Sequence, residues 1–170
     1  MKIGKIVSIA LFLSTSLSSC WYKGDDATAK EEYSLLVKYT LERKKGELTN
    51  LFAENIRTKL EAFDEQVRKL MDYVTGSFVS SVYKGGGAEY TIDNLKQKRF
   101  LFMAACELFT TDSKYFFSLL YCSADDYESK NIGIWNLMAQ KCKNKDDAFI
   151  PYNSYKEWTY GSRYRGITLL

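Results

Sequence analysis

Apolar side chains recur every three or four positions between residues 28 and 76, which is the spacing of amphipathic helices. A hydroxyl followed three positions later by a carboxylate, the form of a capping box, precedes the first apolar stripe, and a glycine follows the first and the last stripe. The pattern predicts three helical stretches: one from Thr28 to a left-handed stop at Gly46, one from Glu47 that divides near Asn55, and one from about Asp64 to Gly76.

After residue 76 the apolar residues alternate with others, as they do in β-strands. The triple glycine at 85–87 lacks the Lys-Ser/Thr pair that follows a phosphate-binding loop, so we interpret it as a flexible hairpin or loop. The alternation predicts these strands: one from Phe78 into the glycines, Lys98 to Phe109, Lys114 to Cys122, Ile132 to Cys142, and a short last one from Arg165 to Leu170.

Helices followed by strands with short turns predict an α+β fold, with N-terminal helices packed on a curved antiparallel sheet. Within the strand from Lys114, the side chains of Tyr115, Phe117, Leu119 and Tyr121 share one face. The other face of the central strands is also apolar. We therefore expect the helices on the concave side, and the convex side partly covered by the C-terminal segment or a partner.

The N-terminus has a different pattern, that of a secretory signal. Residues 1–5 carry two lysines, residues 6–13 are apolar except for Ser8, and residues 14–19 are small except for Leu17. This apolar run is shorter than the roughly 20 residues that span a bilayer. Because the run of small residues ends at Ser19 and Cys20 follows, the segment resembles a bacterial lipoprotein signal, cleaved between these two residues, with a diacylglycerol on the Cys20 thiol.

This interpretation predicts a signal peptide over residues 1–19, a lipidated cysteine with a short tether over 20–27, and one α+β domain over 28–170. The protein would be extracytoplasmic and anchored to the bacterial cell membrane. A covalent anchor of two acyl chains, such as palmitate, is stable, so the domain itself would need no membrane-binding surface. An ordinary cleaved signal is the alternative.

Charge and cysteine content narrow the chemistry. The 24 basic residues include two in the signal, so cleavage would leave 22 against 21 acidic side chains and a net charge of +1. A near-neutral domain gives no electrostatic reason to expect nucleic acid. The chain has no histidine, and Cys106, Cys122 and Cys142 lack metal-ligand spacing. We expect no metal and no cofactor, and interpret these three cysteines as small buried apolar residues. The alternative is that two of them form a disulfide outside the cell.

Several short motifs carry a family resemblance. Residues 46–55, ending in Leu-Phe and a polar turn, and residues 73–76 after the third helix resemble the opening of the nuclear-transport-factor-two-like, or cystatin-like, cone fold. Asp-Glu-Gln at 64–66, Gly-Ser-Phe at 76–78 and Asn-Ile-Gly-Ile at 131–134 resemble the pattern of an uncharacterised Gram-positive lipoprotein family with that fold. The resemblance implies a fold, an anchor and a pocket, but no reaction.

Candidate catalytic residues are few. Without histidine, Ser–His and Cys–His schemes are excluded, but a carboxylate can act with tyrosines. Glu107 is the one charge inside the apolar run of its strand, and in a concave pocket it would meet Tyr39, Tyr73 or Tyr115. The alternative, which we favour, places Glu107 at a solvent-facing or edge position or in an ion pair with an arginine. Trp135 is interpreted as core or pocket wall.

The C-terminal aromatic cluster could pack over the sheet, which we favour, or contact cell-wall polymer or a partner protein. Its members are Tyr152, Tyr155, Trp158, Tyr160, Arg163, Tyr164 and Arg165.

The sequence thus favours a non-enzymatic, lipid-anchored binding domain for a small molecule, peptide or partner protein. Tyr39, Tyr73, Tyr115 and Trp135 are the candidate ligand-binding residues. The alternatives are a small lyase- or isomerase-like enzyme that uses Glu107, and a structural or assembly subunit that forms a homodimer through its sheet.

Overall fold

The structure is a computed structural model that describes residues 27–93, 95, 97–142 and 166–170, with only the backbone described at 89 and 90. The predicted signal peptide, Cys20 and the aromatic segment at 143–165 lie outside the described residues. The predictions made for them therefore stay predictions.

Helices come first, as the apolar spacing predicts. The first helix spans residues 27–41. It is followed by α2 (Lys45–Asn50), α3 (Glu54–Lys59) and α4 (Phe63–Tyr73). The predicted break in the second stretch is confirmed, and α4 begins within one residue of the predicted start.

The stop of the first helix differs from the prediction. Gly46 lies inside α2, and the left-handed residue is Arg43, with a φ of 54°. The Lys44 N–H donates to the Tyr39 carbonyl, which closes the helix in a Schellman-type turn. The guanidinium of Arg43 also donates to Asp72 of α4 at 2.8 Å. Arg43 thus takes the left-handed conformation that a sequence pattern would assign to glycine, and the ion pair with Asp72 and the hydrogen bond from Lys44 accompany it.

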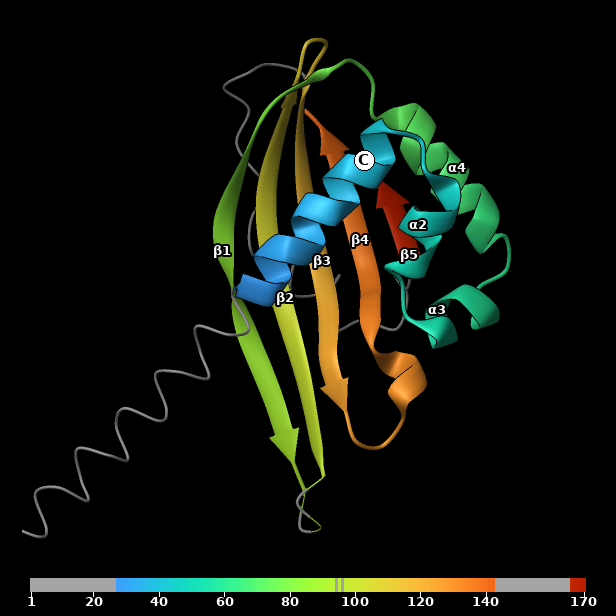
Figure 1. Ribbon diagram of the computed structural model, residues 1–170, viewed down its shortest axis with the longest axis vertical. Coiled ribbons are helices and arrows are strands. Elements are labelled where there is room, and N and C mark those ends of the chain that lie inside the picture. Colours follow the sequence, from blue (N-terminus) through green and yellow to red (C-terminus); the bar gives the residue numbers. More distant parts are fainter. Residues whose placement is uncertain (1–26, 94, 96, 143–165) are drawn as a thin grey trace, which may run out of the picture.

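Within the residues that the structure describes, the strands form one five-stranded sheet in the order β1-β2-β3-β4-β5. Their bounds are β1 Phe78–Ile92, β2 Lys98–Thr110, β3 Lys114–Asp125, β4 Gly133–Lys141 and β5 Gly166–Leu169, with a short 3-10 helix η1 at Ser129–Asn131. The first four pair antiparallel, so the predicted meander is confirmed, whereas β5 pairs parallel to β4. The α+β fold class is confirmed (Figure 1).

The triple glycine is not a loop, contrary to the prediction. It lies within β1, where the register with β2 shifts between Tyr83 and Gly86. A Cβ on Gly86 would lie 1.6 Å from the Met103 carbonyl oxygen of β2. Glycine is required because the bulged strand passes this close to its neighbour.

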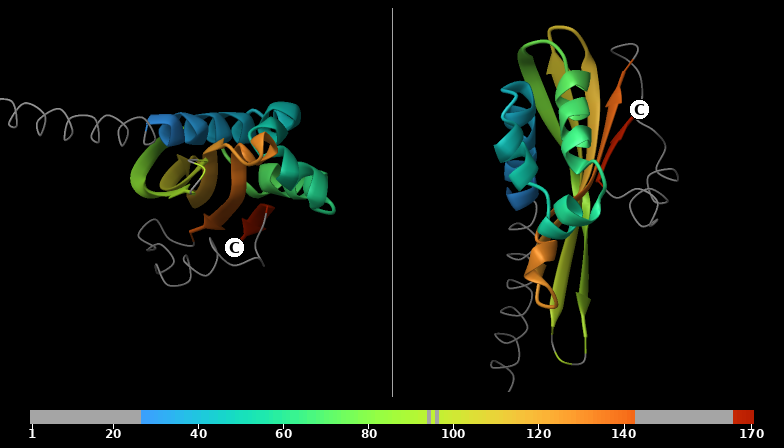
Figure 2. Two further views of the ribbon diagram at one scale, coloured as in Figure 1. Left: turned by 90° about the horizontal axis from the view of Figure 1, so that it is seen from below. Right: turned by 90° about the vertical axis from the view of Figure 1, so that its right-hand side faces the viewer.

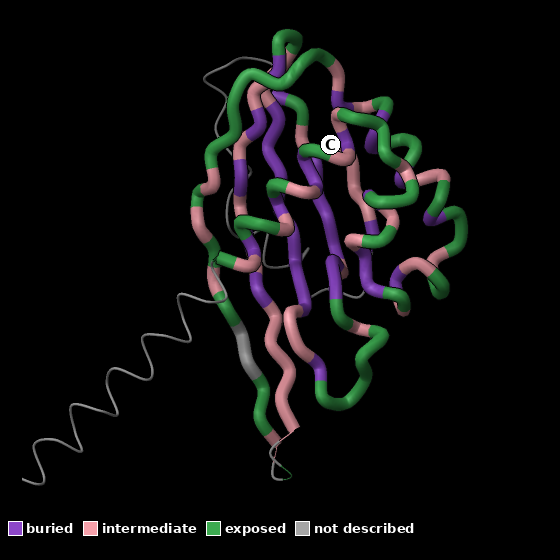
Figure 3. Tube along the Cα trace, in the orientation of Figure 1, coloured by how far each residue is buried: buried purple, intermediate pink, exposed green. Residues whose placement is uncertain are grey.

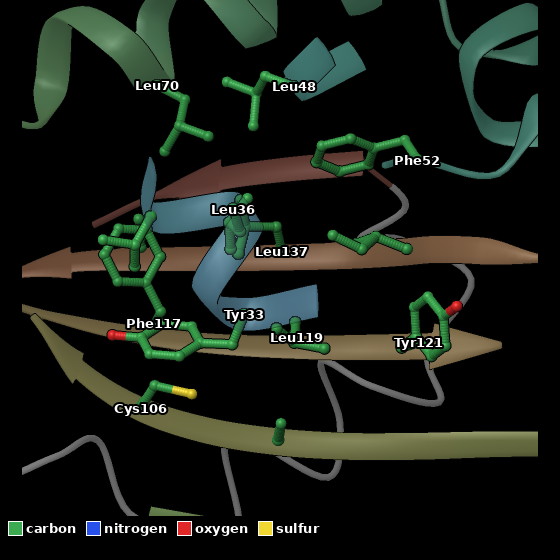
Figure 4. Packing of buried hydrophobic residues seen from close by; sticks show 14 of the residues in the cluster. Tyr33, Leu36, Leu48, Phe52, Leu70, Cys106, Phe117, Leu119, Tyr121 and Leu137 are labelled. Carbon is green, nitrogen blue, oxygen red and sulfur yellow. The ribbon is translucent and has the colours of Figure 1, made fainter. Parts of the chain in front are cut away.

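The helices lie on one face of the sheet and bury a continuous apolar core there (Figure 2). Tyr33 and Leu36 from the first helix meet Phe117 and Leu119 of β3, and Leu70 of α4 joins them (Figure 4). Alternate residues of β2 and β3 are therefore buried under the helices, as the shared face of β3 predicted. This interior therefore contains a cluster of packed apolar side chains from the helices and the sheet.

The opposite, convex face of the central strands is buried as well (Figure 3). Phe116 and Leu120 of β3 and Met138 of β4 are no more than 6% exposed. No described helix or strand covers this face. The sequence predicted that the C-terminal segment or a partner covers it, and both lie outside the described structure, so this stays a prediction.

Candidate functional site

A groove lies between the first helix and the edge strand β1. It has a volume of about 440 Å³. We call it the edge groove. Its lining residues are Ser34, Val37, Lys38, Leu41, Glu42, Phe78 and Ser81.

The edge groove follows from the amphipathic first helix. Tyr33, Leu36 and Val37 point into the core, while Ser34 and Lys38 lie one step around the helix and are exposed. Among the described residues β1 is the last strand on its side of the sheet, so the helix has no further described strand to pack on. The groove therefore has an apolar floor and a polar rim.

Charged residues stand at one end of the groove. The Glu42 carboxylate is 2.7 Å from the Lys44 ammonium, and the hydrogen bond from Lys44 holds the pKa of Glu42 below its usual value. Glu42 is therefore ionised at neutral pH. Lys38, on the same rim, lies 6.0 Å from the centre of the Tyr39 ring. The rim presents both signs of charge, so it favours no net charge in a ligand.

The strand beside the groove exposes apolar side chains and backbone. Phe78 and Val79 are 55% and 59% exposed, and Val82 is exposed too. Val79 falls at a register shift in the β1–β2 ladder, which bulges the strand there. The outer edge of β1 has no strand partner among the described residues. An edge strand of this kind can accept a further strand through its backbone N–H and C=O groups.

Glu107 does not reach the groove or the tyrosines. It pairs with Val82 and Phe116 in the sheet register and shares with them the convex face, away from the helices. Its carboxylate is 3.0 Å from the Lys84 ammonium and 3.1 Å from the Lys114 ammonium. The geometry matches the favoured expectation that Glu107 forms an ion pair, but the partners are two lysines where the sequence suggested arginine.

The electrostatics of Glu107 also differ from those of a general base. Burial alone would raise the pKa of this carboxyl, but hydrogen bonds from Lys84 and Lys114 outweigh burial, so the pKa is lowered. A general base works best with a pKa near the operating pH. Glu107 is therefore held apart from Tyr39, Tyr73 and Tyr115, and its lowered pKa is unlike that of a general base.

Of the four candidate ligand-binding residues, the structure brings Tyr73 and Tyr115 into contact, with ring centres 5.9 Å apart. Tyr115 is fully buried, and its hydroxyl accepts a hydrogen bond from the Thr75 N–H at 2.9 Å. The Tyr73 hydroxyl accepts from the Lys141 N–H at 2.7 Å. Tyr39 and Trp135 are partly buried and pack against the core. These hydroxyls and rings connect helices and strands to one another. None of the four residues lines the edge groove.

The cysteines behave as the sequence suggested. Cys106, Cys122 and Cys142 are buried thiols. Burial raises the pKa of Cys122 to about 11 and that of Cys106 further. A thiol that stays protonated is a poor nucleophile and metal ligand. Within the described ranges, no group of three or more Cys, Asp or Glu residues could hold a metal ion.

The sequence analysis missed the edge groove. Its floor is formed by one side of the first helix and by β1, the last described strand on that side of the sheet. The alternation of residues along a strand does not predict the order of strands in the sheet. One signal was present: Phe78 and Val79 are consecutive large apolar residues, although a half-buried strand would alternate.

Together these features define an α+β domain with a filled core and a groove at its sheet edge. The model of one protein family, described as Domain of unknown function (DUF5104), matches residues 35–144. The match covers well over half of the chain, which therefore belongs to this family. No curated protein matched the chain. In the part of the chain that the structure describes, no helix is long and apolar enough to cross a membrane.

Proposed function

We propose that this protein is a non-enzymatic binding domain, anchored by lipid on Cys20 to the outer face of a bacterial membrane, whose edge groove takes an extended apolar peptide. The anchor rests on the signal pattern, and the cone fold rests on the family resemblance of residues 46–55 and 73–78. The observation that carries the binding role is the edge groove beside a strand whose outer edge has no partner among the described residues.

An extended peptide fits the groove better than a compact small molecule does. Its backbone can pair with the outer edge of β1, and alternate side chains then point into the groove. The floor offered by Val37, Leu41 and Phe78 suits aliphatic or aromatic side chains. Because the rim carries both positive and negative side chains, the bound peptide does not need to be charged. The peptide belongs to a partner protein or to a second copy of this chain, which the test below distinguishes.

The anchor is tested first. We expect the N-terminal peptide of protein purified from the producing cells to carry the mass of a diacylglycerol on Cys20. Cys20→Ala should move the protein from the membrane fraction to the soluble fraction. A wild-type N-terminus without added mass, together with a Cys20→Ala variant that remains membrane-bound, would refute the anchor.

The groove is tested by photo-crosslinking in the producing cells. A photoreactive p-benzoylphenylalanine replaces Ser34, which lines the groove, or Ser80, an exposed serine on the opposite face of β1 as matched control. We expect crosslinked peptides from position 34 only, and loss of the crosslink when Leu41→Arg places a charge on the groove floor. Equal yields from both positions, or none, would refute a groove ligand, and a crosslink to a non-peptide molecule would refute the peptide.

Sequencing of the crosslinked peptide identifies its source. A peptide from this chain supports the dimer, and light scattering of the purified protein should then give twice the monomer mass. A peptide from another protein supports a binding domain. Both results place a strand beside β1, and hydrogen exchange should then show slower exchange of β1 backbone amides in the complex.

A further inference from the structure

Arg99 stands near the start of β2, in a cluster of side chains that the edge groove does not include. It pairs with Asp125 near the end of β3, and η1 lies at the same end of the sheet (Figure 1). Phe78, beside the groove, pairs with Thr110 at the other end of β2, about 35 Å along the strand. We call these side chains the Arg99 cluster, whose members are Arg99, Asp125, Tyr127, Asn131 and Trp135.

The Asp125 carboxylate fixes one side of the arginine. The Asp125 side chain is fully buried, and its Oδ2 accepts hydrogen bonds from the Arg99 Nε at 2.7 Å and the Asn131 Nδ2 at 2.8 Å. Its Oδ1 accepts from the backbone N–H groups of Tyr127 at 2.9 Å and Glu128 at 3.1 Å. Burial alone would raise the pKa of Asp125, but the hydrogen bonds outweigh burial and lower it. The group is therefore ionised at neutral pH and held at both oxygens.

Asn131 connects this carboxylate to the helices. Its side-chain oxygen accepts a hydrogen bond from the Asn55 Nδ2 at 2.7 Å, and its backbone carbonyl accepts one from the Trp135 indole N–H. The two asparagines belong to residues 46–55 and 131–134, the segments that carry the family resemblance. Residues from the helical layer and the sheet thus hold Asp125, and through it Arg99, in place.

Two aromatic rings lie next to the guanidinium. The Arg99 Cζ is 5.3 Å from the centre of the Tyr127 ring and 5.8 Å from that of the Trp135 ring. These cation–π contacts restrain the arginine further. The Arg99 side chain is nevertheless 35% exposed. Within the described part of the chain, neither of its two terminal amino groups has a hydrogen-bond partner.

We propose that the Arg99 cluster binds the carboxylate group of a ligand through two parallel hydrogen bonds from the terminal amino groups of Arg99. The planar fork of a guanidinium matches the two oxygens of a carboxylate. Because Asp125 already holds the fork, little conformational entropy is lost on binding. Tyr127 is 43% exposed and offers apolar surface to the rest of the ligand. This site depends neither on the edge groove nor on the lipid anchor.

Charge favours a carboxylate over a phosphate. The cluster contains one cation, Arg99, and Asp125 already balances its charge. A phosphate group carries close to two negative charges at pH 7, so it would need a second cation beside Arg99. A carboxylate carries one charge and is satisfied by the two N–H donors. It could come from a small organic acid or from the C-terminus of a peptide, and the test distinguishes these sources.

The test follows binding by NMR in the ¹⁵N-labelled full chain, purified as the cells produce it. Sodium benzoate is the probe, at constant ionic strength, and benzamide, which has the same ring without the charge, is the matched control. The reporters are the Nε–H signal of Arg99 and the indole N–H signal of Trp135. We expect benzoate to shift both signals to saturation with a dissociation constant on the order of millimolar, and benzamide to shift neither.

A pair of variants tests the role of the fork. Arg99→Lys keeps the charge but removes the fork, so it should weaken benzoate binding, read at Trp135, by about tenfold or more. Arg68→Lys is the matched control, because Arg68 of α4 is also an exposed arginine that pairs with a carboxylate, that of Glu65. It should leave binding unchanged. In the wild type, nuclear Overhauser contacts from the benzoate ring to the Tyr127 ring test the site without any variant.

The proposal is overturned if benzoate gives no saturable shift, if benzamide shifts the same signals equally, if the contacts to Tyr127 are absent, or if both variants weaken binding equally. N-acetylphenylalanine then identifies the source. Tighter binding than that of benzoate indicates a peptide C-terminus, and equal or weaker binding indicates a small acid. A negative result leaves the edge groove and the lipid anchor untouched, since neither involves Arg99.

Discussion

Gly86 offers a sharp test of how β1 passes over β2. The structure puts the Cβ of Gly86→Ala 1.6 Å from the Met103 carbonyl oxygen, 2.7 Å from its carbon and 3.0 Å from the Phe102 ring. The first two atoms belong to a strand backbone and cannot rotate away. The strands must therefore separate locally. Gly87→Ala is the control, because its nearest neighbour outside the adjacent residues is the flexible Met103 side chain at 4.0 Å.

The magnitude follows from what must be lost. Separation of the strands at this point breaks about two ladder hydrogen bonds at about 1 kcal/mol each, and repacking around Phe102 adds about 1 to 2 kcal/mol. We expect Gly86→Ala to lower the free energy of unfolding by about 3 to 4 kcal/mol. Gly87→Ala should be neutral or stabilising by up to about 1 kcal/mol, since it restricts the unfolded chain.

The assay is urea unfolding of the non-lipidated Cys20→Ser chain, followed by far-ultraviolet circular dichroism. With a slope of about 2 kcal/mol per molar urea, the midpoint of Gly86→Ala should fall by about 1.5 M or more, and that of Gly87→Ala should stay within about 0.5 M. Two midpoints that agree would refute the bulged register between Tyr83 and Gly86.

Further predictions concern the charge cluster, the core and the thiols. Glu107→Gln should cost about 1 to 3 kcal/mol at pH 7, because it leaves two lysine ammonium groups near the sheet without their carboxylate partner. Since the folded pKa of Glu107 is lowered, its contribution is present above the unfolded value of about 4.5 and is lost as the pH falls through the folded value. The urea midpoints of wild type and variant should therefore draw together as the pH falls below about 4.5. Phe117→Ala should lower the free energy of unfolding by about 3 to 5 kcal/mol in the same assay, since removal of the fully buried ring leaves a cavity in the core. A loss no larger than that caused by substitution of an exposed residue would contradict the packing. Iodoacetamide at pH 8 should leave Cys106 and Cys122 unmodified in the native protein and alkylate both in urea, because burial raises the pKa of each thiol; rapid native labelling by mass spectrometry would contradict their burial.

The sequence determined the order and type of the elements. Apolar spacing separates a helical first half from a β-rich second half, and the short turns between β1 and β4 dictate a meander because neighbouring strands in the chain pair most easily. The alternation in β3 predicted which residues share a face. These features are local: each depends on residues a few positions apart.

Tertiary structure decided which face meets the helices. Both faces of β2 and β3 are apolar, so alternation gives two equivalent answers, and only the packing of the helices puts Cys106 inside and Glu107 on the other side. That choice removed the carboxylate from the tyrosines. Backbone conformation was also decided at a distance: Arg43, tied to Asp72, takes the left-handed position predicted for Gly46.

The edge groove could likewise not be predicted from the sequence, because it depends on how distant elements pack together. The edge groove exists because β1 is the last strand on its side within the described part of the chain, and strand order is a property of the whole sheet. The sequence determined the N-terminal pattern that predicts an anchor at Cys20. The fold decided that the first helix runs along the sheet to the groove beside Phe78, because a helix direction is fixed by the sheet on which it packs.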